Sequence, residues 1–283
     1  MCKARLSFTI FMQIFLFTLL LTTLGFGQED SLKTWRITMQ DGSELVGNIV
    51  DENDEKIWFI THSGLELSID RAKVVEIEAV KGSWKKGKFT IEDPNTTRLF
   101  FAPSAKTLEK GAGYFSIYEI FFPMLAIGIT DFFTFSGGMS LFPGSDEQIL
   151  YVAPKVRLLH TKEVDFSTGI LYAILFDENF GIAYGVGTFQ KSGYAVTGGM
   201  GWGFVDGDFS STPVVMLGLE AGLSRRLKFI SENWFVPVED GGLLSFGLRF
   251  FGKYLAADFG LMKPLESTDG FPFLPWIGFT VNF

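Results

Sequence analysis

The sequence predicts an all-β protein, in which a transmembrane antiparallel β-barrel of about 12 strands follows a small five-stranded barrel. Aromatic residues make up 16% of the chain, and 32 Phe and 32 Gly occur mostly after Tyr114. In that region apolar and small residues alternate with a period of two, as in a β-strand. Turn residues separate segments close to the ~10 residues that a tilted strand needs to cross a bilayer.

Residues 1–27 are predicted to be a secretory signal peptide. Basic residues precede the apolar run Leu6–Leu24, and small residues end the segment. The run also approaches the length that spans a bilayer, so a retained transmembrane anchor is the alternative. Cys2, the only cysteine, lies in this segment. We therefore expect a mature chain without disulfides.

The charge of the chain is acidic. Lys and Arg number 24 against 32 Asp and Glu, a net charge of −8. Loss of the leader, which carries Lys3 and Arg5, makes the mature chain more acidic still. Nucleic acid is not an expected partner, because binding it requires a basic surface.

Residues 34–80 are predicted to form a small domain. "WRITMQDGSELVGNIV" has two alternating runs around Asp41-Gly42, which is a hairpin signal, and "IWFITHSGLELSID" forms a second hairpin. "RAKVVEIEAV" supplies a fifth strand, so a half-open barrel is expected. The pattern resembles the SH3-like or Sm-like barrels of bacterial envelope proteins, which implies no catalytic residue. The domain is expected to serve as a spacer or as a docking surface for a periplasmic protein.

Residues 81–112 are expected to be a linker or a plug of the barrel lumen. "KGSWKKGKF" is basic and contains Gly, and Pro94 and Pro103 interrupt the rest of this stretch. Arg98–Ala102 could form a short strand or a plug inside the next domain. Sequence alone leaves both open.

Residues 113–283 contain the expected barrel strands. The turn signals and the alternation predict twelve: Tyr114–Phe122, Met124–Thr130, Phe133–Phe142, Ile149–His160, Asp165–Phe176, Phe180–Gln190, Gly193–Phe204, Pro213–Leu223, Arg226–Val236, Gly242–Phe251, Tyr254–Met262 and Leu274–Phe283.

The two faces of these strands predict a membrane environment. One face is apolar, as in Leu244, Phe246, Leu248 and Phe250, whereas the other carries mostly Gly, Ala and Ser with rare charges. A soluble sandwich would expose a polar face. We expect the apolar face to meet lipid, and we place Phe180, Ile182, Tyr184 and Val186 there as well. A closed barrel pairs its backbone amides within the bilayer.

The connections predict two different barrel ends. Turns expected on the periplasmic side are short: 131–132, 161–164, 191–192, 224–225 and 252–253. Loops expected outside are mostly longer and acidic: 143–148, 177–179, 205–212, 237–241 and 264–273. This asymmetry is typical of outer-membrane barrels. The first hairpin, with its turn around Pro123, fits least well.

The signal sequence, the paired strands and the terminal Phe283 resemble a bacterial outer-membrane β-barrel. "TRLFFAPSAKTLEKGAGYFSIYEIFFP", "VAPKV", "GVGT", "GGMGWGF" and "ENWF" are similar to an uncharacterised group of envelope barrels, from Thr97 to the end. The resemblance implies a Gram-negative cell outer membrane, a periplasmic N-terminal domain, and outer-membrane lipid and the barrel-assembly machinery as partners. Phe279, Val281 and Phe283 would form the assembly signal.

Enzyme chemistry is not expected. His62 and His160 are the only histidines, and neither has a serine or carboxylate at a spacing that suggests a triad. His160 shares the parity of the residues expected to face lipid. No metal and no cofactor are expected, because the mature chain offers neither a thiol nor a histidine pair.

Charged residues on the inner face are the candidate site. The expected lumen-lining residues are Tyr151, Lys155, Arg157, Glu220, Glu232, Arg249 and Asp258. They form either an ion-pair network that plugs the barrel or the lining of a narrow pore. The main expectation is a non-enzymatic envelope anchor or interaction protein, and the alternative is a porin-like channel or transporter for a small solute.

Six aromatic residues have a structural and a functional interpretation. In the first they form an interfacial girdle or pack the lumen, and in the second they form a platform for a ligand. They are Trp202, Trp234, Trp276, Tyr114, Tyr172 and Tyr254.

Overall fold

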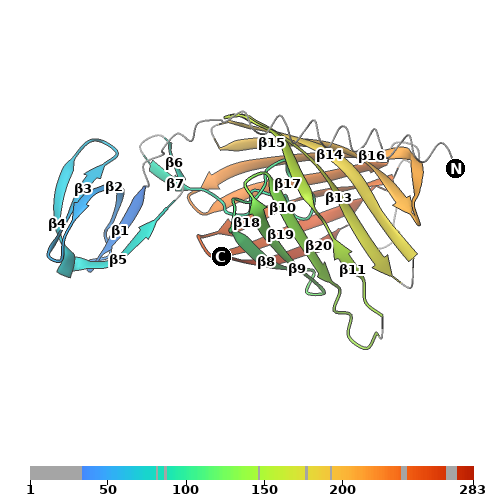
Figure 1. Cartoon of the computed structure of the whole chain (residues 1–283), viewed down its shortest axis with the longest axis horizontal. Coiled ribbons are helices and arrows are strands. Elements are labelled where there is room, and N and C mark those ends of the chain that lie inside the picture. Colours follow the sequence, from blue (N-terminus) through green and yellow to red (C-terminus); the bar gives the residue numbers. More distant parts are fainter. Residues whose placement is uncertain are drawn as a thin grey trace. The chain divides into compact units, whose positions relative to one another are not determined.

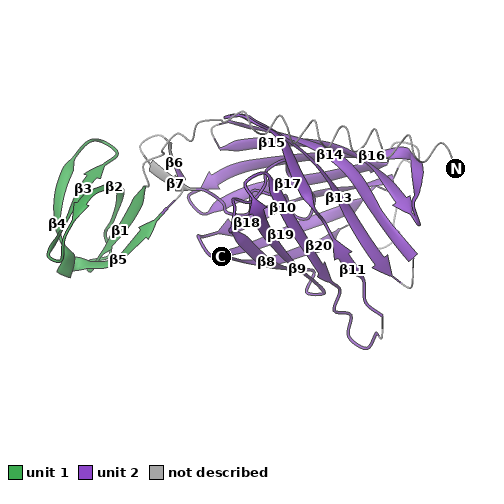
Figure 2. Cartoon of the chain, viewed as in Figure 1, with its two compact units in different colours: residues 1–79 green, residues 80–283 purple. Residues whose placement is uncertain are grey.

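The structure is a computed structural model that describes residues 34–80, 82–85, 88–145, 147–175, 178–191, 193–236, 241–265 and 273–283. The predicted signal peptide, residues 1–27, lies outside these residues. The chain divides into two compact units, residues 1–79 and 80–283 (Figure 2).

The first unit is one antiparallel sheet of five strands. These are β1 (Trp35–Met39), β2 (Glu44–Glu52), β3 (Lys56–Thr61), β4 (Glu66–Asp70) and β5 (Val74–Ala79), with a 3-10 turn at Arg71–Lys73 before β5. The strand order is β4-β3-β2-β1-β5. Ile37, Ile57 and Phe59 are buried against one another. The five strands agree with the prediction, and the SH3-like character remains a resemblance.

The second unit begins with the hairpin β6 (Gly82–Lys85) and β7 (Lys88–Ile91). The barrel strands come after it: β8 (Gly113–Tyr118), β9 (Phe122–Thr130), β10 (Phe133–Met139), β11 (Leu150–Val152), β12 (Lys155–His160), β13 (Val164–Leu175), β14 (Glu178–Lys191), β15 (Tyr194–Val205), β16 (Asp208–Ser224), β17 (Leu227–Val236), β18 (Gly241–Phe251), β19 (Leu255–Pro264) and β20 (Leu274–Asn282) (Figure 1).

These strands form a closed antiparallel barrel. Consecutive strands pair from β8 to β11 and from β12 to β20, and β20 pairs with β8. The short strands β11 and β12 share one place in the wall, since both pair with β10 and β13. The barrel therefore has twelve strands, which confirms the predicted fold class.

The barrel has one end that carries both of its chain termini. The Gly113 amide donates to Phe283 O, with an N···O distance of 2.8 Å, and the Phe283 amide donates to Gly113 O, with an N···O distance of 2.9 Å. We call this the terminal end and the opposite one the loop end. Among the described residues, no helix is long and apolar enough to cross a membrane.

Three local predictions were wrong. The expected loop 205–212 is a two-residue turn at Asp206-Gly207, where φ is 50° and 91°, as in a tight hairpin. The first hairpin turns at 119–121 and not around Pro123, which lies within β9. The expected strand Ile149–His160 is broken between β11 and β12, at Pro154, which lacks an N–H for the ladder.

The outer face of the barrel carries the apolar stripes. Large apolar side chains remain exposed on most strands, among them Phe115, Leu125, Phe135, Phe166, Phe189, Leu217, Phe246, Phe250, Phe259, Phe279 and Val281. A soluble monomer rarely exposes an apolar surface of this extent. The arrangement suits contact with lipid.

Strand β14 reverses the expected faces. Val186 is 1% exposed and belongs to the internal core, and Tyr184 packs against that core. A Cβ built at Gly185 or Gly187 would instead meet the ring of the outward Phe166. Between Phe180 and Gly187 neither face of β14 carries a charged residue, so alternation alone could not tell which one faces lipid.

Candidate functional site: a divided barrel lumen

Polar side chains line the half of the lumen next to the terminal end. These side chains point into the lumen, and each is less than a tenth exposed. They are Ser116, Thr134, Lys155, Asp165, Ser167, Thr188, Thr197, Glu220, Glu232, Ser245, Arg249, Asp258 and Thr280. Buried polar groups require partners. Most of these groups find them in the chain that precedes β8.

Residues 93–108, which we call the lumen segment, lie inside this half. The Leu99 amide donates to Ala102 O at 2.9 Å, and the Ser104 amide donates to Thr97 O at 3.0 Å, which makes a tight hairpin. Leu99, Phe100 and Ala102 at its tip are fully buried. On the return path, the Ala105 amide bonds Thr188 Oγ1 at 2.9 Å.

Two glycines of the wall allow this close approach. A Cβ at Gly128 would lie 2.0 Å from the carbonyl oxygen of Glu109, and one at Gly218 would lie 2.2 Å from Leu99 Cδ1. Neither position therefore tolerates a side chain while the segment is in place. Some inner-face glycines thus belong to an internal packing surface.

Arg249 forms the centre of the charge network. Its Nε donates to Asp258 Oδ1 at 2.6 Å, and its Nη1 lies 3.1 Å from Asp93 Oδ2. It also donates to the carbonyl oxygens of Asn95 (2.9 Å) and Leu99. Arg98 of the lumen segment reaches the same Asp258 at 2.7 Å. One wall arginine and one wall aspartate therefore bind the segment from the same side.

Lys228 extends the network. Its Nζ lies 2.8 Å from Asp93 Oδ2 and 2.7 Å from Glu220 Oε1. Lys228 was not among the expected lumen residues, because its strand alternates poorly. Its parity with Glu232 in β17 was the available signal.

Two wall charges bind only uncharged groups of the chain. Glu232 Oε2 accepts the amides of Phe101 and Ala102 at 3.0 Å each, and its Oε1 accepts Trp234 Nε1 at 2.8 Å. Lys155 Nζ donates to Thr97 O at 2.8 Å and to Ser104 O at 2.9 Å. Among the described residues, neither has an opposite charge within 4.0 Å.

The other expected lumen residues lie apart from this network. Tyr151 donates its hydroxyl to Pro123 O at 2.6 Å. Arg157 bonds Asp131 O at 2.8 Å and lies 3.9 Å from Asp165.

The expectation that His160 faces lipid was wrong. The pairing of β12 with β13 shifts between Arg157 and Leu159, and such a bulge moves the following residues to the other face. His160 Nδ1 consequently lies 2.5 Å from Asp165 Oδ1. Asp165 was not among the expected lumen residues.

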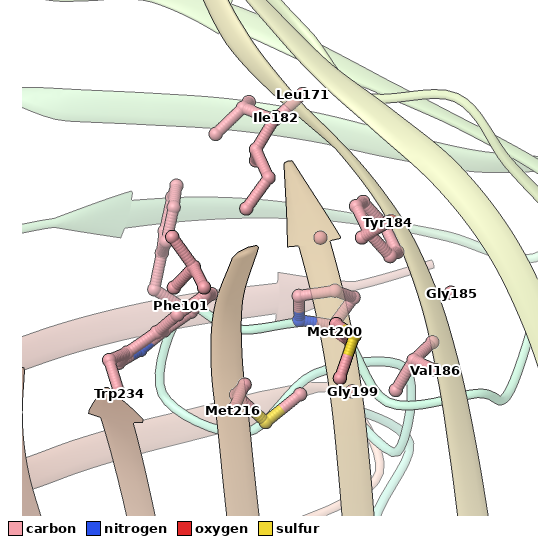
Figure 3. A pocket seen from close by; sticks show the side chains of 13 residues that line it. Phe101, Leu171, Ile182, Tyr184, Gly185, Val186, Gly199, Met200, Met216 and Trp234 are labelled. Atoms are coloured by element: carbon pink, nitrogen blue, oxygen red, sulfur yellow. The ribbon is translucent and has the colours of Figure 1, made fainter. Parts of the chain in front are cut away.

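The half of the lumen toward the loop end has an apolar lining. One pocket of about 40 Å³ is lined by Phe101, Pro103, Leu171, Ile182, Tyr184, Gly185, Val186, Gly199, Met200, Gly201, Val214, Met216 and Trp234. Figure 3 shows Phe101 and Trp234 on one side of this space, with Tyr184 and Val186 opposite. None of the lining residues is charged.

A second pocket of about 60 Å³ adjoins the first. The two share Phe101, Pro103, Leu171 and Tyr184. The second also has polar lining, from Thr97, Arg98, Thr134, Ser136 and Lys155. Both of its charged residues are cationic. Thr97 Oγ1 and Arg98 Nε are buried without a hydrogen-bond partner among the described residues.

The six aromatic residues divide by face. Tyr114 and Trp276 are buried in the internal core, and Trp234 packs against it. Trp202 and Tyr254 are exposed, at 42% and 56%. Tyr172 stacks on Phe204. In the part of the chain that the structure describes, no group of three or more His, Cys, Asp or Glu could hold a metal ion.

Comparisons with known proteins add remote likenesses. No protein-family model and no curated protein matches the chain. The solved KdgM porin in complex with disordered oligogalacturonate aligns with a TM-score of 0.48 and 9% identity, over 61% of this chain and 98% of that one. The outer-membrane expressed OmpT of Vibrio cholerae aligns with a TM-score of 0.32 and 10% identity, over 89% and 95%. At these values the likeness carries no inference about function.

Proposed function

We propose that this chain is an outer-membrane β-barrel that takes a small solute into its loop-end half and lets it pass only when the lumen segment shifts. The division of the lumen carries this proposal. The terminal half is filled by residues 93–108, whereas two adjoining pockets remain open beside the tip of the segment, one in the loop-end half and one at its border with the terminal half. A barrel that served only as an anchor would not need this space.

The outer face supports the membrane part of the proposal. Exposed aromatic and aliphatic side chains surround a barrel whose backbone amides are paired, which is the requirement for crossing hydrocarbon. Phe279 and Val281 belong to that surface at 51% and 49% exposure, and Phe283 is 61% exposed. We propose outer-membrane lipid and the barrel-assembly machinery as partners, and these three residues as the assembly signal.

An anchoring or interaction role is the second candidate. It is favoured by the separate five-stranded unit, where an open pocket of about 500 Å³ is lined by Val50, Trp58 and Leu67 among others. In that case residues 34–80 would contact a periplasmic protein, and the barrel would hold them at the membrane.

Ion conductance of purified protein in planar bilayers tests the primary proposal. Ser104 N bonds Thr97 O, so Arg98–Pro103 can be replaced by Gly-Gly to close a shorter hairpin. The wild type should be mostly closed, and the shortened variant should conduct steadily. A control that changes the exposed Arg225 to Gln should behave like the wild type. If the shortened variant folds but conducts no more than the wild type, the transport proposal fails and the anchoring role is favoured.

A further inference from the structure

The two adjoining pockets together have one apolar part and one cationic part. The first has no charged lining residue, whereas the charged residues of the second are Arg98 and Lys155. Lys155 is 4% exposed and has no carboxylate within 4.0 Å among the described residues. A buried ammonium without a counter-charge is unfavourable. An anionic group in the second pocket would relieve this cost.

Unpartnered polar atoms lie at the same place. Arg98 Nε and Thr97 Oγ1 are buried without hydrogen bonds among the described residues, and both residues line the second pocket. Lys155 donates two bonds to carbonyl oxygens, while an ammonium group has three donors. The pocket thus offers free hydrogen-bonding capacity beside an uncompensated positive charge.

From these features we infer that the two adjoining pockets bind a small amphipathic anion, with its anionic head near Lys155 and Arg98 at the border of the terminal half, and its apolar body among Leu171, Ile182 and Met216. This inference rests on the proposed function and names its solute class. Pockets of about 40 and 60 Å³ enclose only a small group, whereas sites for drug-sized ligands measure about 300–1,000 Å³. A short acyl chain is the matching size.

The space in the apolar pocket depends on glycine positions of β15. A Cβ at Gly199 would lie 3.3 Å from Met216 Cε and 3.5 Å from Val186 Cβ, so a larger side chain there projects into the pocket. The neighbouring Gly198 points outward, where a Cβ would meet only Leu217 Cδ2 at 3.9 Å. Gly199→Leu and Gly198→Leu are therefore a matched pair on one strand.

The probes are hexanoate, hexan-1-ol and hexylammonium. Binding to the wild-type protein in zwitterionic lipid nanodiscs is followed by the intrinsic tryptophan fluorescence, to which Trp234 in the pocket wall contributes, with empty nanodiscs as the lipid blank. Hexanoate should bind at least tenfold more tightly than hexan-1-ol, and hexylammonium should bind least. Gly199→Leu should weaken hexanoate binding about tenfold or more, and Gly198→Leu should leave it unchanged. Val214→Phe provides a second way to fill the pocket if Gly199→Leu fails to fold.

Lys155→Met tests the head group. It should abolish the preference for hexanoate over hexan-1-ol while leaving hexan-1-ol binding within about twofold. The inference is overturned if the wild type binds the three probes equally, or if Gly198→Leu and Gly199→Leu reduce binding alike. Conductance of the Gly-Gly variant is measured independently of binding. An open pore without hexanoate preference would therefore reject the solute class and retain the transport proposal.

Discussion

The two halves of the barrel lumen share one wall but have opposite linings. In the terminal half, inward charges such as Arg249 and Asp258 are fully buried and bonded to the lumen segment. In the loop-end half, Ile182 and Trp234 are half-buried around a pocket. The charges of this barrel therefore serve mainly to bind its own chain. The pocket without a charged lining residue lies where the inner face is apolar.

The largest expected effect concerns the polar half. Arg249→Gln should lower the free energy of unfolding by about 3–5 kcal/mol, because it leaves Asp258 and Asp93 buried with fewer donors. Urea unfolding in nanodiscs measures this change. Arg225→Gln, the same substitution at an exposed turn, should change it by less than about 0.5 kcal/mol. Equal midpoints for the two variants would show that the network does not stabilise the barrel.

An isoleucine in each half gives a direct comparison. Ile230 is fully buried in the internal core, so Ile230→Ala should cost about 2–5 kcal/mol. Ile182 lines the pocket, where less surrounding structure is packed against it. Ile182→Ala should cost about 1 kcal/mol, because its side chain is less completely removed from solvent. The same urea titration compares them, and a larger loss for Ile182→Ala would contradict an unfilled loop-end half.

Much of the fold was predictable from sequence because alternation, turn residues and strand length agree with one another. Leu244 to Phe250 shows this, since a regular period of two and a boundary glycine defined β18 closely. Arg249 and Asp258 could be assigned to the inner face for the same reason. Their partners could not, because Asp93 and Arg98 come from a segment without periodicity, 156 and 160 residues away in the chain.

The errors have local physical causes. A bulge near Leu159 changes the parity of His160, and such a shift leaves no mark in the sequence. Between Phe180 and Gly187 both faces of β14 are uncharged, so only the outward Phe166 over Gly185 shows which one meets lipid. The apolar pocket was missed for this reason, because Ile182 and Tyr184 had been assigned to the lipid face.

Glu232 connects the two halves, since it binds the segment tip and Trp234. Glu232→Gln should weaken the tip contacts by about 1.5–3 kcal/mol, because bonds to a charged acceptor become bonds to a neutral one. Phe101→Cys gives a single thiol at the tip once the leader with Cys2 is absent. Maleimide should label that thiol about tenfold or more faster when the Phe101→Cys protein also carries Glu232→Gln. Glu178→Gln, at an exposed position of β14, should leave the labelling rate unchanged.

The smallest expected effect tests the outer face of β14. A Cβ at Gly187 would approach neighbouring atoms no closer than 3.9 Å, so Gly187→Leu places an apolar side chain toward lipid. Strand glycines cost about 0.5–1 kcal/mol relative to residues with a side chain, so this variant should be neutral or slightly more stable. Gly218→Leu, by contrast, would place its Cβ 2.2 Å from Leu99 and should displace the lumen segment. Heat-modifiable gel mobility reports the folded fraction of each. If Gly187→Leu assembles as poorly as Gly218→Leu, then the small face of β14 is internal, and the apolar pocket loses Ile182 and Tyr184 from its wall.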